Sequence, residues 1–113
     1  MEQAEFLQQH VFTDLKNLND GFDQEDIQYF SESDFETILG RAEHFGIGIY
    51  EIKPFFNGEP YKVLGHLDHN KKATDPRWFK KAFLTFKTGQ AGLVYSATYK
   101  VSKKLLARES LGL

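Results

Sequence analysis

Apolar side chains near the start of the chain recur at steps of three and four residues. Four of them fall on one helical face: Leu7, Val11, Leu15 and Leu18. This spacing predicts an amphipathic helix over residues 3–18, which Gly21 would end. Residues 22–32 then read as a short acidic connector, held to the core by Ile27, Tyr29 and Phe30.

A second helix is predicted over residues 33–45. Ser33 is its expected N-cap, and Glu36, three positions later, completes a capping box. One apolar stripe follows the helix: Phe35, Ile38, Leu39, Ala42 and Phe45. Gly46 is the expected C-terminal stop.

The period then changes from helical to alternating. Residues 47–52 predict a strand that Pro54 closes, and Asn57-Gly58 predicts a turn. Residues 61–64 would return as a second strand, and Phe55 and Phe56 before the turn suggest a hairpin loop longer than two residues. Residues 65–74 read as a loop.

The last third of the chain predicts one more helix and one more strand. Asp75 as N-cap and Pro76 at the first helical position open the helix, and Gly89 ends it. Residues 93–101 predict a strand with Tyr95 and Tyr99 on the same face. A short basic helix over residues 103–109 follows.

These elements predict a single α+β domain over residues 1–113. We expect a small three- to four-stranded, mainly antiparallel sheet with two or three helices packed on one face. A fourth strand could come from residues 22–30 or 65–74.

Composition narrows the setting of the chain. It has no cysteine among its 113 residues, which excludes disulfides, zinc–cysteine sites and cysteine nucleophiles. The N-terminus lacks the basic start and apolar run of a signal peptide, and no stretch approaches a membrane span. We therefore expect a cytoplasmic protein.

Charge is distributed unevenly along the chain. Residues 1–45 carry eleven acids against two bases, whereas residues 46–113 carry five acids against twelve bases. Such a division suggests a charged partner or two complementary faces, and the protein could be a monomer or a homodimer.

The acidic stretch from Asp20 to Glu36 is the candidate binding surface. Its expected protein-binding residues are Asp20, Asp23, Glu25, Asp26, Tyr29 and Glu32. Carboxylates steer association with a basic partner and aromatic side chains supply affinity. We therefore expect a protein-binding module, in the manner of an inhibitor or immunity-type protein; alternatively, the aromatic residues belong to the core and the acids are an ordinary solvated loop.

Two alternative functions remain open, and neither carries a catalytic motif or calls for a cofactor. Basic residues with Trp78 and Tyr99 between them would suit nucleic acid: Lys71, Lys72, Arg77, Lys80, Lys81, Lys100, Lys103, Lys104 and Arg108. His66, Asp68 and His69 would be the residues of a small enzyme or metal site, although their spacing matches no familiar zinc motif.

Four runs of the sequence also carry a resemblance: Phe35–Leu39, Gly46–Pro54, Asn57–Tyr61 and Asp75–Phe79. With their IGIY strand, NGE turn and DPxW helix start, they resemble a group of small bacterial proteins usually labelled hypothetical. The resemblance spans most of the chain and implies no activity. In size, acidity and α+β makeup the chain is also similar in type to bacterial toxin-immunity proteins, with which it shares no motif.

Overall fold

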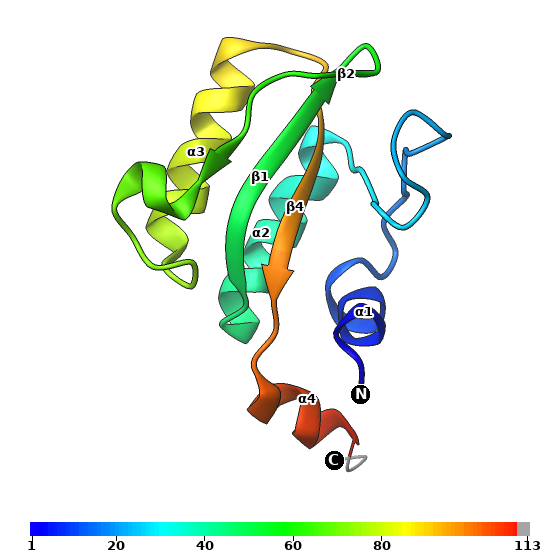
Figure 1. Cartoon of the computed structure of the whole chain (residues 1–113), viewed down its shortest axis with the longest axis vertical. Coiled ribbons are helices and arrows are strands. Elements are labelled where there is room, and N and C mark those ends of the chain that lie inside the picture. The colour runs from blue at the N-terminus through cyan, green and yellow to red at the C-terminus, as the bar shows by residue number, and fades with distance from the viewer. Residues whose placement is uncertain (111–113) are drawn as a thin grey trace.

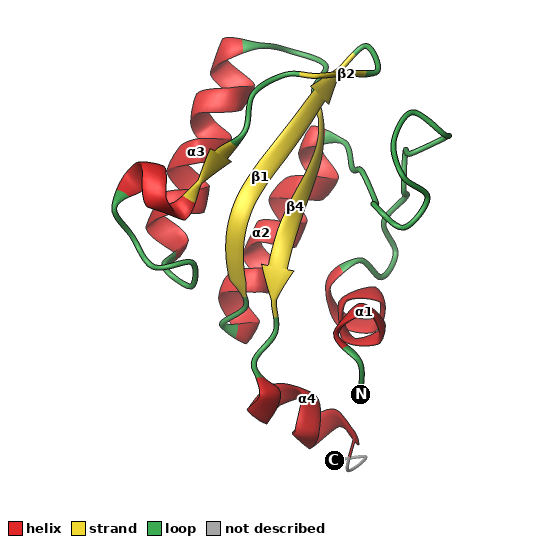
Figure 2. Cartoon of the chain, viewed as in Figure 1, coloured by secondary structure: helices red, strands yellow, loops and turns green. Residues whose placement is uncertain are grey.

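A four-stranded antiparallel sheet forms the centre of the computed structural model, which describes residues 1–110 (Figures 1 and 2). Strand β1 (Gly48–Phe56) pairs along one edge with β4 (Val94–Lys100). Its other edge pairs with two short strands, β2 (Glu59–Pro60) and β3 (Leu64–Gly65). The predicted α+β class with a small antiparallel sheet is confirmed.

The β1–β2 hairpin corrects the predicted loop length. Phe56 pairs with Glu59, so the loop contains only Asn57 and Gly58. Both residues have positive φ, 53° and 78°, which is the backbone of the type I′ turn that favours Asn-Gly.

The prediction that Pro54 closes β1 is wrong. Proline lacks a backbone N–H, but β4 does not need a hydrogen bond from β1 at this position. Tyr95, which lies opposite Pro54, directs both its backbone N–H and C=O to Phe30 on the other side of β4. The chain therefore continues through Pro54 to Phe56.

The predicted returning strand is interrupted. Residues 61–63 leave the sheet between β2 and β3, and the segment after β3 forms a 3₁₀ helix, η2 (His66–His69). Of the two stretches considered for a fourth strand, 65–74 contributes only Gly65, and 22–30 contributes an isolated bridge between Phe30 and Tyr95.

Helices α2 (Glu32–Phe45) and α3 (Pro76–Gly89) lie side by side against one face of the sheet (Figure 1). Asp75 caps α3 as predicted, since its Oδ1 accepts the Arg77 N–H at 2.9 Å. The cap of α2 is Ser31 and not Ser33: the Ser31 Oγ accepts the Asp34 N–H at 3.2 Å. Gly46 ends α2 with a φ of 67°, as expected.

Aromatic rings fill the space between these helices and the sheet. Phe35 of α2 stacks on Tyr95 of β4 with ring centroids 5.1 Å apart, and Phe83 of α3 meets the same ring edge-on at 5.3 Å. All three residues are buried. On the strands, Ile52, Pro54 and their partners Ala97 and Tyr95 face this core, whereas Glu51, Lys53 and Phe55 face the opposite side.

The first helix is shorter than its apolar spacing predicts. It consists of α1 (Gln3–Phe6) and a π-helical turn, η1 (Leu7–Val11). Arg41 ends it from a distance, because its Nη1 donates to the Val11 and Thr13 carbonyls at 2.8 Å each. Asp14 then takes a left-handed backbone, with a φ of 67°, and Leu15 and Leu18 lie outside the helix.

The N-terminal segment meets the end of β4. The Gln3 side chain donates to the Tyr99 carbonyl at 3.0 Å and accepts the Val101 N–H at 2.8 Å. Helix α4 (Lys103–Ser110) follows β4 and contacts α1. Within residues 1–110, none of the helices is long and apolar enough to cross a membrane.

Candidate functional site

Residues 17–29, which include most of the acidic connector, form an ordered loop built around the side-chain amide of Asn19. We call these residues the acidic loop. The Asn19 Nδ2 donates to the carbonyls of Asp23, Gln24 and Ile27 at 3.3, 2.8 and 2.8 Å. Its Oδ1 accepts the N–H groups of Gly21 and Asp23 at 3.1 and 3.4 Å. Asn19 thus replaces the regular backbone pairing that the loop lacks.

Asn17 connects the two ends of the acidic loop. Its Oδ1 accepts the N–H groups of Asn19 and Tyr29, both at 2.9 Å. The Leu18 N–H donates to the Tyr29 carbonyl at 2.7 Å. Since Phe30 in turn pairs with Tyr95, the loop is joined to the edge of β4.

Asp23 and Tyr29 fasten the middle of the acidic loop. The Tyr29 hydroxyl donates to the Asp23 Oδ2 at 2.5 Å, and the Gln24 N–H donates to the Asp23 Oδ1 at 2.7 Å. Both hydrogen bonds favour the carboxylate and lower the pKa of Asp23, with the Tyr29 bond the larger cause. Burial, reinforced by the Asp23 hydrogen bond, raises the pKa of Tyr29 to about 12.

Three aromatic rings attach the acidic loop to the side of the sheet that the helices leave open. Phe22 lies 4.9 Å from Tyr29 and 5.3 Å from Phe55 of β1, and Tyr29 meets Phe55 edge-on at 4.9 Å. Tyr29 is only 1% exposed. It is therefore an anchor of the loop and not the contact residue predicted from the sequence.

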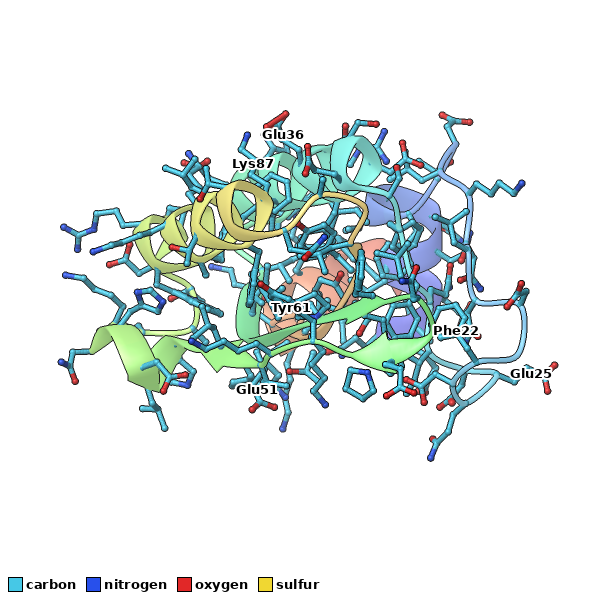
Figure 3. All side chains as sticks on the ribbon, turned by 90° about the horizontal axis from the view of Figure 1, so that it is seen from above. Phe22, Glu25, Glu36, Glu51, Tyr61 and Lys87 are labelled. Atoms are coloured by element: carbon cyan, nitrogen blue, oxygen red, sulfur yellow. The ribbon has the colours of Figure 1, made fainter. Side chains whose placement is uncertain are left out.

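The other predicted acids are accessible. Asp20, Glu25, Asp26 and Glu32 are exposed, whereas Asp23 is half-buried. None of these five acids forms an ion pair with another residue in the part of the chain that the structure describes. Figure 3 shows Glu25 pointing away from the body of the molecule. The predicted site thus divides into an anchor, Asp23 and Tyr29, and free carboxylates.

A groove of about 380 Å³ runs beside the acidic loop on the open side of the sheet. Apolar side chains from the loop, from β1, from β2 and from the segment after β2 line much of it: Ile27, Tyr29, Phe55, Pro60 and Val63. Val63 is 47% exposed, so the groove offers apolar surface to a partner next to the free carboxylates.

Two acids on α2, Glu36 and Glu43, differ from those of the loop, because bases from the second half of the chain pair with them. Lys80 Nζ lies 2.5 Å from the Glu43 Oε1, and Lys87 Nζ lies 3.6 Å from the Glu36 Oε1. The uneven charge along the sequence is therefore partly balanced within the fold, whereas the acids of the acidic loop form no ion pair among the described residues.

The predicted nucleic-acid surface loses its aromatic component. Trp78 is 1% exposed and its Nε1 donates to the Ala73 carbonyl at 3.3 Å. The Tyr99 ring packs against Phe12 at 5.5 Å, and its hydroxyl is buried. Neither ring can stack on a base in this conformation. Arg77 is bound to Asp75, which holds the pKa of that carboxyl at about 2.

The three side chains of the histidine cluster, His66, Asp68 and His69, contact different parts of the fold. His66 Nδ1 lies 2.8 Å from the Lys71 carbonyl, and the Asp68 Oδ2 accepts the Gly65 N–H at 2.7 Å. His69 packs against Trp78, with ring centroids 5.7 Å apart. Across residues 1–110, no group of three or more His, Cys, Asp or Glu side chains is arranged to hold a metal ion.

Asn17 and Asn19 were not among the site residues predicted from the sequence. Asparagine is common in loops because its amide can satisfy backbone groups of neighbouring residues, which is the signal that could have indicated their role.

The chain matches no protein-family model, no curated protein and no solved structure.

Proposed function

We propose that this protein is a binding module that docks a basic protein partner through its acidic loop. One observation carries the proposal: Asp20, Glu25 and Asp26 are exposed and unpaired within the described chain, while Asn19 fixes the backbone that presents them. A preorganised loop loses less conformational entropy on binding than a disordered one.

The neighbouring groove supports the same function. Carboxylates raise the rate of association with a basic surface, but exposed ion pairs contribute little net affinity. Apolar contact supplies the rest, and the groove beside the loop offers it through Phe55 and Val63. An inhibitor or immunity-type protein that covers a cationic site on its target would need this combination.

The test is affinity capture from a lysate of the source cell at low and high salt, about 0.05 and 0.5 M, since high salt screens exposed charges. Glu25→Lys with Asp26→Lys should reduce capture of a basic protein by more than about tenfold. The matched control, Glu2→Lys with Glu51→Lys, makes the same change in net charge at exposed positions outside the loop and the groove and should capture normally.

Two outcomes would contradict the proposal. Equal loss of binding in both variants would show a response to net charge alone. Recovery of nucleic acid in place of protein would favour the exposed lysines of the second half of the chain. Val63→Asp tests the contribution of the groove to binding separately from that of the loop. It should weaken capture at both salt concentrations.

A further inference from the structure

Helices α2 and α3 form a second groove, on the side of the helical layer that faces away from the sheet. Its volume is about 440 Å³. Leu39 and Phe83 are nearly buried at its base, and Leu84 is 54% exposed. The two ion pairs cross this groove, Glu43 to Lys80 and Glu36 to Lys87. Figure 3 shows Glu36 and Lys87 close together on the outer side of the helices.

The two helices present the same spacing with opposite charge. On α2 the exposed line is Glu36, Gly40 and Glu43; on α3 it is Lys80, Leu84 and Lys87. Each line follows the i, i+4, i+7 rule that places residues on one helical face. The ion pairs show that the helices are antiparallel, since the earlier acid pairs with the later base.

We propose that two copies of this chain associate face to face through these helices, around a two-fold axis parallel to them. This rotation places α2 of each copy over α3 of the other and preserves the height of every residue along the helices. Because Glu36 is level with Lys87 and Glu43 with Lys80 inside one chain, the same pairs meet between the copies. The four helices then form an antiparallel bundle.

Apolar shape fits the same arrangement. Gly40 lies three residues before Glu43, and Leu84 lies four residues after Lys80, so their heights differ by only about 1.5 Å. A Cβ built on Gly40 would meet nothing within 4 Å, which leaves a hollow on α2. In the dimer the exposed Leu84 of each copy lies over the Gly40 hollow of the other, as a knob over a hole.

Charge selects this axis over the alternative. A two-fold axis perpendicular to the helices would place α2 over α2 and α3 over α3, so that glutamates face glutamates and lysines face lysines. Like charges in contact oppose association. The shared face is about 21 Å long and roughly 20 Å wide, since it consists of two helices of fourteen residues. Its area of about 420 Å² is smaller than the ~800 Å² per partner of a standard interface. We therefore expect a dissociation constant in the micromolar range.

The test is sedimentation velocity of the full chain over a concentration series up to about 1 mM, well above the expected dissociation constant. Glu36→Lys with Glu43→Lys makes the face wholly basic, and Lys80→Glu with Lys87→Glu makes it wholly acidic. Each variant alone should be monomeric, with association at least about tenfold weaker than that of the natural chain. An equimolar mixture of the two should restore the dimer.

Controls separate this result from misfolding and from net charge. Lys103→Glu with Lys104→Glu on α4 changes net charge as the acidic variant does and should leave the dimer intact. Leu84→Gln should weaken it without changing any charge. A natural chain that stays monomeric at the highest concentration, or a mixture that fails to associate while both variants keep the native circular dichroism spectrum, would overturn the proposal.

Discussion

The acidic loop and the helical layer are held in place by different physical means. In the loop, one side chain, Asn19, makes five hydrogen bonds to backbone groups within residues 21–27. In the helical layer, α2 and α3 are fixed by buried rings that contact several elements at once, as Phe35 contacts Tyr95 and Phe83. Damage to the loop should therefore remain local, whereas damage to the layer should affect the whole fold.

Phe35→Ala should have the largest effect. Removing this fully buried ring leaves a cavity between α2, α3 and β4, and we expect a loss of about 3–5 kcal/mol in the free energy of unfolding. Urea unfolding followed by circular dichroism measures it. The neighbouring exposed Thr37→Ala should change stability by less than about 0.5 kcal/mol. Similar values for the two variants would contradict the burial of Phe35.

Asn19→Ala should have an intermediate effect that is confined to the acidic loop. Because several backbone groups lose their partners at a partly exposed site, we expect about 1–3 kcal/mol. Hydrogen exchange should accelerate at residues 21–29 and remain unchanged in α2 and α3. Gln24→Ala, which removes an exposed side chain of the same loop, is the control. Faster exchange throughout the chain would show that the loop and the helices are not separate in stability.

Tyr29→Phe should have the smallest effect on the free energy of unfolding. It should also change how that free energy depends on pH. It removes the hydrogen bond to Asp23 and should cost about 1 kcal/mol near neutral pH. The pKa of Asp23 is lowered from 3.8 in the folded protein, so its contribution is present above that value and is lost as the pH falls below it. The pKa of Tyr29 is raised to about 12, so its contribution is complete below about pH 10 and is lost as the pH rises through 12.

Chemical denaturation between about pH 2 and 7 tests the acid side of this expectation. The stability of the natural chain should fall more steeply on acidification than that of Tyr29→Phe. Tyr61→Phe, at an exposed ring, should follow the natural chain. Parallel curves for the natural chain and Tyr29→Phe would show that the Asp23–Tyr29 bond does not fasten the loop.

The start of α3 and the turn at Asn57-Gly58 were predicted correctly from local signals in the sequence. Asp75-Pro76 determines the start of α3 by capping and fixed φ alone, and Asn57-Gly58 determines a turn in the same way. The prediction of a helix over residues 3–18 was wrong, although Leu15 and Leu18 keep a helical spacing. Arg41, about 30 residues away, binds the Val11 and Thr13 carbonyls that would have accepted the next hydrogen bonds of the helix. No local pattern records such a contact.

The candidate site shows the same division. Residue type and solvation correctly suggested that Asp20, Glu25 and Asp26 are accessible. The separate roles of Asp23 and Tyr29 depend on a hydrogen bond between them and on rings from β1, and neither follows from spacing. Trp78 likewise looks like a surface aromatic between basic residues until the packing of η2 and α3 places it in the core.

The hydrogen bonds that Gln3 and Phe30 make to β4 limit the pairing of β4 with strands of other molecules. A long strand with an open edge invites a strand from another molecule, which is a common route to aggregation. Phe30 occupies this edge at Tyr95, and the Gln3 amide occupies it at Tyr99 and Val101, so a foreign strand finds the pairing positions at both ends already taken. The segments around Gln3 and Phe30 thus protect β4, and this edge is shielded only once both segments have packed beside it.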